Sequence, residues 1–147
     1  MKRFFHRLVI TAALVVAAAS AALAGGGAPY VQVWGPHADG LYAVHTYMCE
    51  NPASLRVTAW AEGLVDGKRQ SLPIKLQKMK EKGVYKFARN WPEHGTWAIR
   101  MKVEKGGNSP ITLAAMDEHG KVTQFKLIWE GDPEKACVAI LNGEDDC

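Results

Sequence analysis

Two common catalytic motifs are absent from the sequence. It has no G-x-S-x-G, which would place a serine nucleophile on a strand-to-helix turn, and no H-E-x-x-H, which would pair two zinc ligands on a helix. None of its three cysteines is followed by the closely spaced His and Met that a blue-copper loop requires. The sequence therefore favours a non-enzymatic binding module over an enzyme.

A hydrophobic run long enough to cross a membrane is also absent. The mostly apolar run Leu8–Leu23 has 16 residues, whereas a membrane-spanning helix needs about 20. It follows a basic segment and ends in Ala22-Leu23-Ala24, which is the order of regions in a secretory signal. We predict a signal peptide over residues 1–24 and a periplasmic or secreted mature chain. An uncleaved anchor is the alternative.

Once the signal is removed, the chain has no excess of positive or negative charge. The full chain has 18 basic and 15 acidic residues, and three of the basic ones, Lys2, Arg3 and Arg7, lie in the signal. The mature chain, residues 25–147, is therefore near neutral, so we expect no nucleic-acid partner and no membrane contact after cleavage. Its length suits a single domain with one core and a C-terminal tail.

Helical periodicity is almost absent from the mature chain. Short segments of alternating apolar and polar residues recur instead, with Gly, Pro, Asp and Asn between them, which is typical of an all-β sandwich or barrel. We expect eight antiparallel strands, at Tyr30–Trp34, Leu41–Cys49, Leu55–Glu62, Leu72–Lys78, Val84–Arg89, Thr96–Val103, Ile111–Met116 and Val122–Trp129.

Two further features of the sequence predict an edge strand and a helix. Pro73 predicts that the fourth strand lies at a sheet edge, and the lysines around the following turn would discourage edge-to-edge association. Asp132-Pro133-Glu134 is typical of a helix start, and Asn142-Gly143 of a helix end. A short C-terminal helix is favoured over a ninth strand at Ala136–Leu141.

The number of cysteines is odd, so one is left over from any disulfide. Export would permit a disulfide, and Cys49 with Cys137 would tie the C-terminal segment to an early strand. Cys137 with Cys147 is the alternative and would close only a tail loop. We favour Cys49–Cys137, because Cys147 is the last residue and follows an acidic stretch.

One stretch resembles a known family. The residues Gly83-Val84-Tyr85 and Pro92-Glu93-His94-Gly95-Thr96-Trp97 follow a G-x-Y…P-x-x-G-x-W pattern, which resembles the YtkA-like and FixH-like exported domains over about Leu55–Val103. The resemblance implies an immunoglobulin-like antiparallel β-sandwich of seven to nine strands, and a link to copper handling. The segment before the pattern has one Met and no His, unlike the metal-handling segment of that family.

Three histidines lie in loops that the strand count places together. In an up-and-down arrangement of eight strands, the first, fifth and seventh connections share one end of the sandwich. These connections contain His37, His94 and His119. Because neutral imidazole suits copper and zinc, the three side chains are a candidate metal site. Their chance occurrence in polar loops is the alternative.

Three tryptophans are candidates for partner binding. Trp60 lies on the polar face of its strand, and with Trp34 and Trp91 it could form an aromatic platform for a protein or a glycan. Covering of the sheet by a loop or the C-terminal segment is the alternative. We thus expect a binding module of the cell envelope, either a copper or other metal accessory protein or an adhesion or interaction domain.

Overall fold

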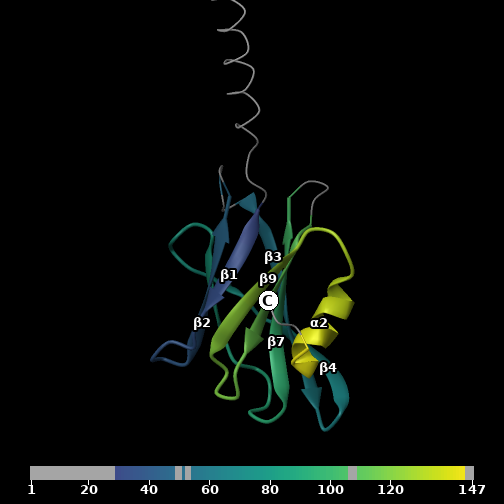
Figure 1. The fold of residues 1–147 in the computed structure, drawn as a ribbon. Coiled ribbons are helices and arrows are strands. Elements are labelled where there is room, and N and C mark those ends of the chain that lie inside the picture. Colours follow the sequence, from purple (N-terminus) through teal and green to yellow (C-terminus); the bar gives the residue numbers. More distant parts are fainter. Residues whose placement is uncertain (1–28, 49–50, 52–53, 106–108, 145–147) are drawn as a thin grey trace, which may run out of the picture.

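The computed structural model describes residues 29–48, 51, 54–105 and 109–144. The predicted signal peptide, Cys49 and Cys147 lie outside these residues. Within them the chain forms a β-sandwich of two antiparallel sheets with a C-terminal helix (Figure 1). The strands are β1 (Tyr30–Trp34), β2 (Leu41–Tyr47), β3 (Arg56–Val65), β4 (Lys68–Ile74), β5 (Gln77–Lys78), β6 (Val84–Ala88), β7 (Thr96–Glu104), β8 (Ile111–Met116) and β9 (Val122–Ile128).

The sheets have the orders β1-β2-β6-β5 and β4-β3-β7-β8-β9. Alternation of side chains explains the core between them, as β7 shows. Trp97, Ile99, Met101 and Val103 are all buried and face the other sheet, because residues two apart share a face. The predicted antiparallel sandwich is confirmed, with nine strands in the described residues instead of eight.

The ninth strand arises where one strand was predicted, over Leu72–Lys78. The chain forms β4 at the edge of the five-stranded sheet, passes through residues 75–76, and joins the four-stranded sheet as β5. Pro73 lies on the edge strand, as predicted, where its missing N–H removes no ladder hydrogen bond. A single alternating pattern therefore spans two sheets.

The connection between the strands predicted at Leu55–Glu62 and Leu72–Lys78 is shorter in the structure. β3 continues to Val65, and Asp66 and Gly67 alone make the turn, with φ values of 50° and 72°. Two central residues with positive φ are typical of a type I′ hairpin, whose twist matches that of the flanking strands. The longer hairpin extends β3 to Val65 and β4 to Lys68, which pair with each other.

The predicted C-terminal helix is confirmed as α2 (Pro133–Asn142). The Asp132 carboxylate caps it by accepting from the backbone N–H groups of Glu134 and Lys135, and Gly143 ends it in the left-handed conformation. α2 lies on the outer face of the five-stranded sheet beside β7 (Figure 1). No helix in the described part of the chain is long and apolar enough to span a membrane.

Candidate functional site

The three loops that carry the candidate metal ligands do share one end of the sandwich. The Val122 N–H, after the loop of His119, donates to the carbonyl of Gly35, before His37, over 3.2 Å. The Tyr42 hydroxyl donates to the Gly120 carbonyl over 2.7 Å. A Cβ added at Gly120 would lie 3.4 Å from the guanidinium of Arg89, which leads into the third loop. The loops therefore meet through backbone and through Tyr42.

The structure does not gather the histidines of these loops into a metal site. Among the described residues, no three His, Cys, Asp or Glu side chains lie close enough together to hold a metal ion. The His119 imidazole lies 3.5 Å from the carboxylate of its neighbour Glu118 and is largely exposed. The predicted ligand set of His37, His94 and His119 is corrected accordingly, because a shared end brings loops together without aligning their side chains.

The aromatic platform is also wrong. Trp91 is buried in the core, 5.7 Å from the Tyr42 ring and 6.2 Å from the Trp97 ring. Trp34 lies at the end of β1 in the four-stranded sheet and contacts Phe125 edge-on. Trp60 lies on the outer face of the five-stranded sheet. The three candidate residues therefore occupy the core and two different sheets.

The predicted disulfide does not form in the structure, where Cys137 is a free and fully buried thiol. It packs with Leu141 of α2 onto Ala98 and Leu113, on the outer face of the five-stranded sheet. β2, which precedes Cys49 in the chain, belongs to the other sheet, and Cys49 itself lies outside the described residues. Burial raises the pKa of Cys137, which favours an unreactive thiol.

A charged cluster lies on the same outer face, at the start of α2. Its centre is Glu62 in β3, whose side chain is only 3% exposed. Ser71 of the neighbouring strand β4 pairs directly with Glu62, and its hydroxyl donates to Glu62 Oε1 over 3.0 Å. A buried carboxylate is stable only when its charge is matched and its oxygens are hydrogen-bonded. The neighbouring strands supply both.

Two arginines flank Glu62 from the neighbouring strands. Arg100 of β7 places Nη2 at 3.1 Å from Glu62 Oε1, and Arg69 of β4 places Nη2 at 3.6 Å from Oε2. Both are diagonal neighbours of Glu62 on the same face, which is within reach of long side chains. The Arg100 guanidinium also lies over the Trp60 ring, at 5.1 Å. This cation–π contact holds the guanidinium against the sheet.

Glu134 completes the cluster from the first turn of α2. It contacts Arg69 Nη2 at 2.8 Å and Arg100 Nη1 at 3.5 Å, so that one carboxylate bridges both guanidinium groups. An acid is also favoured at this position by the helix dipole. Its side chain is 58% exposed, in contrast to that of Glu62. The cluster therefore has one buried acid and one exposed acid.

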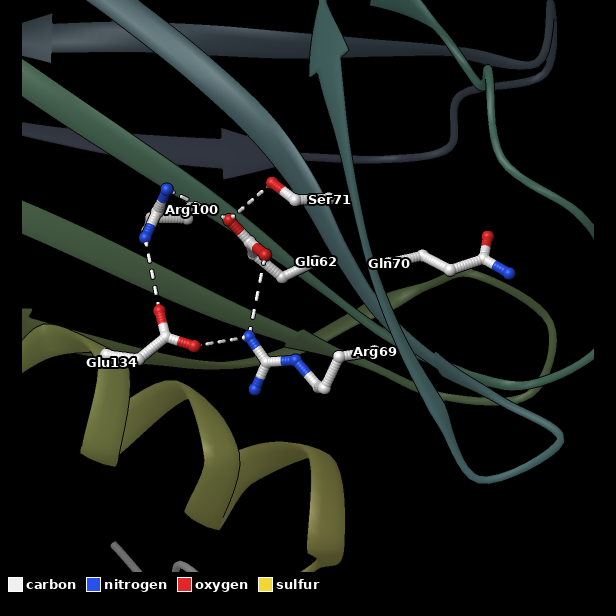
Figure 2. A pocket seen from close by; sticks show the side chains of 6 residues that line it. All are labelled: Glu62, Arg69, Gln70, Ser71, Arg100 and Glu134. Carbon is white, nitrogen blue, oxygen red and sulfur yellow. Dashed lines mark hydrogen bonds and ion pairs between the residues drawn. The ribbon is translucent and has the colours of Figure 1, made fainter.

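The cluster borders a hollow of about 260 Å³. Figure 2 shows the side chains of Glu62, Arg69, Ser71, Arg100 and Glu134 pointing toward one another, whereas Gln70 lies apart across β4. Two guanidinium groups that converge on one exposed carboxylate form an arrangement that can bind a carboxylate or another small anion.

Sequence reasoning missed this cluster. Trp60 was predicted on the polar face of its strand, and the predicted strands included Glu62 and Arg100. Arg69 was assigned to no strand. The one available signal was that Arg69 and Ser71 are two residues apart, so that both would share a face if the strand of Pro73 began earlier. Recognising it required the two-residue turn at Asp66, because the register of a hairpin follows from its turn.

Comparisons with known proteins found no matching family model, no curated protein and no solved structure similar to this chain.

Proposed function

We propose that this protein is an exported, immunoglobulin-like, non-enzymatic binding module of the cell envelope, which binds a ligand carboxylate between Arg69 and Arg100. The observation that carries the proposal is the bridging position of Glu134. Its exposed carboxylate contacts both guanidinium groups at 2.8 and 3.5 Å. A ligand carboxylate would take the same place when Glu134 turns away into solvent.

The charge of the cluster supports a ligand with a single negative charge. With Glu134 in place, two arginines balance two glutamates. Without it, Glu62 balances only one guanidinium, so one positive charge faces the hollow. Arginine suits this role because its planar fork can donate two parallel hydrogen bonds to a carboxylate. Trp60, under Arg100, adds an apolar surface beside the anion.

The hydrogen bonding of Glu62 supports binding rather than catalysis. Ser71 and Glu62 resemble a nucleophile with a neighbouring base, since the hydroxyl donates to the carboxylate over 3.0 Å. The same carboxylate also contacts both guanidinium groups. Its contacts with both arginines give Glu62 a structural part in the anion site, where it holds the two guanidinium groups in place.

The proposal can be tested with N-acetylglycine, which presents a peptide-like terminal carboxylate. Protein expressed from the full-length chain would be titrated and its arginine side-chain NMR signals followed. We expect millimolar binding to wild type, since a weak solvated contact yields about 4 kcal/mol. Glu134→Gln should bind about tenfold more tightly, because the internal competitor is gone, and Arg100→Gln should bind more weakly.

Arg89→Gln is the matched control for this titration. Arg89 contacts Trp91 and donates to the carbonyls of Trp91 and Pro92, at a distance from the cluster. Its loss should leave the affinity for N-acetylglycine unchanged. If Glu134→Gln binds no better than wild type, the idea that Glu134 stands in for a ligand is wrong.

A further inference from the structure

A second hollow opens at a different edge of the sandwich, between the beginning of β3 and the strands β5 and β6. Its volume is about 390 Å³. It arises because β5 has only two residues, Gln77 and Lys78, paired with Lys86 and Tyr85. Beyond this short ladder, no strand in the described residues closes the gap toward β3. The hollow therefore lies between β3 of one sheet and β5 and β6 of the other.

The inner wall of this hollow, called the edge cleft below, is apolar. Leu55 and Tyr85 belong to the buried core and are 3% and 7% exposed. Val57 and Leu76 pack against that core and are partly exposed. The Tyr85 hydroxyl donates to the Leu55 carbonyl over 3.4 Å. This bond joins the two buried residues beneath Val57 and Leu76.

The rim of the edge cleft is basic. Lys78 and Arg56 line it, and both are exposed. Glu104 lies opposite Arg56 in the ladder but already pairs with Lys102 at 2.9 Å. Lys78 has no ion-pair partner among the described side chains. The following turn adds Lys80 and Lys82 against a single acid, Glu81.

We propose that the edge cleft binds an amphipathic anion, an unbranched alkyl chain with one acidic head group, such as a medium-chain fatty acid. The chain would lie along the partly exposed Val57 and Leu76. The head group would lie between Arg56 and Lys78. The volume is at the small end of ligand pockets, which run from about 300 to 1,000 Å³. This favours a short or medium chain. The proposal is independent of the Arg69–Arg100 site, which uses the outer face of the five-stranded sheet.

The length of the alkyl chain is the first variable to test. Octanoate, decanoate and dodecanoate would be titrated below their aggregation concentrations into protein expressed from the full-length chain, with NMR signals of Leu55, Val57 and Tyr85 as the readout. Each added methylene should strengthen binding about three- to fourfold until the cleft is full. Affinity that does not change with chain length would overturn the proposal.

The head group is the second variable. Decanol should bind at least about fivefold more weakly than decanoate, because it lacks the charge that Lys78 and Arg56 would meet. Lys78→Glu should weaken decanoate binding by a similar factor, whereas the matched variant Lys68→Glu, at the start of β4, should not. Equal binding of decanol and decanoate would contradict the assignment of an acidic ligand.

A third experiment fills the cleft with a larger side chain. It also tests whether the ligand is a free fatty acid or a membrane lipid. Val57→Trp should abolish decanoate binding while circular dichroism and thermal unfolding report a folded sandwich. If Val57→Trp unfolds, Leu76→Trp is the second variant, because Leu76 lines the cleft from the segment before β5. Free decanoate should compete with binding to phosphatidylglycerol vesicles if both present the same chain and charge. Binding to vesicles without any competition would mean a membrane surface instead of the cleft.

Discussion

At the residue scale, Glu62 decides the character of the outer face. It is a carboxylate that is almost fully buried on the middle of a sheet, and Arg69, Arg100 and Ser71 contact it from two neighbouring strands. Buried charges lose their hydration, so each must be compensated by close partners. Glu62 and its partners belong to three strands, β3, β4 and β7, so these contacts tie the three strands in one register.

Replacing Glu62 should therefore cost more than replacing an exposed acid. We expect Glu62→Ala to lower the free energy of unfolding by about 3 to 5 kcal/mol, because two partly buried guanidinium groups lose their counter-charge. Urea denaturation would measure it. Glu104→Ala is the control: its exposed pair with Lys102 should contribute nothing measurable. Equal losses in both variants would mean that burial does not matter here.

Gly63 is the second residue with an unusual constraint. Its backbone lies against the indole ring of Trp97, on the facing position of β7, so that a Cβ added at Gly63 would overlap the ring. Gly63→Ala should lower the free energy of unfolding by about 1 to 3 kcal/mol through overpacking. In a double-mutant cycle with Trp97→Leu the two losses should be less than additive. Additive losses would contradict this contact.

At the scale of elements, α2 joins the apolar and the charged parts of the outer face. Cys137 and Leu141 cover Ala98 and Leu113, while Glu134 reaches the arginines from the first turn. Position along the helix thus separates the two contacts. The cap at Asp132 sets where the first turn begins, and so where Glu134 lies.

Removing this cap should loosen both contacts. We expect Asp132→Ala to lower the free energy of unfolding by about 1 kcal/mol. It should also raise the rate at which Cys137 reacts with a thiol reagent, because the thiol is protected by the packing of α2. The rate would be measured with Cys49 and Cys147 replaced by serine. Glu130→Ala, just before the helix, should change neither quantity.

At the scale of the whole molecule, stability at high pH depends on two buried groups, the Cys137 thiol and the Tyr42 phenol. Burial raises the pKa of the Cys137 thiol above its ordinary value of 9.0, and burial also raises that of the Tyr42 phenol, partly offset by Arg89. Each group keeps its proton longer in the folded chain. Above about pH 9 the unfolded chain releases protons that the folded chain retains, and this favours unfolding.

We therefore expect the free energy of unfolding to fall as the pH rises from about 9 toward 11. Urea denaturation at a series of pH values would measure the slope. The fall should be smaller in Cys137→Ala, which removes one of the two groups, although this variant starts from a lower stability because its cavity costs packing. An identical slope with and without the thiol would show that Cys137 does not contribute.

Much of the fold could be predicted because its signals are local. The alternation in Thr96–Val103 identified the buried face of β7, and Asp132, Pro133 and Gly143 marked the ends of α2. A period of two or a capping residue requires only near neighbours in the chain. The split of the predicted Leu72–Lys78 strand was missed because alternation continues while the chain changes sheets.

The candidate sites failed for the opposite reason. Counting strands placed the loops of His37, His94 and His119 at one end, but only side-chain positions decide whether imidazoles meet. The strand pattern could not show that Trp91 turns into the core beside Tyr42. The Arg69–Glu62–Arg100 contacts depend on the register of three strands, and register follows from pairing between distant segments.

The sequence by itself determined the strand faces, the helix with its caps, and the charge balance of residues 25–147, because each depends on composition or on neighbouring residues. Only the tertiary structure decided that Glu134 bridges two arginines, that Cys137 is a free buried thiol, and that a short β5 leaves a cleft. These features depend on which sheet each segment joins, and long-range packing alone specifies that choice.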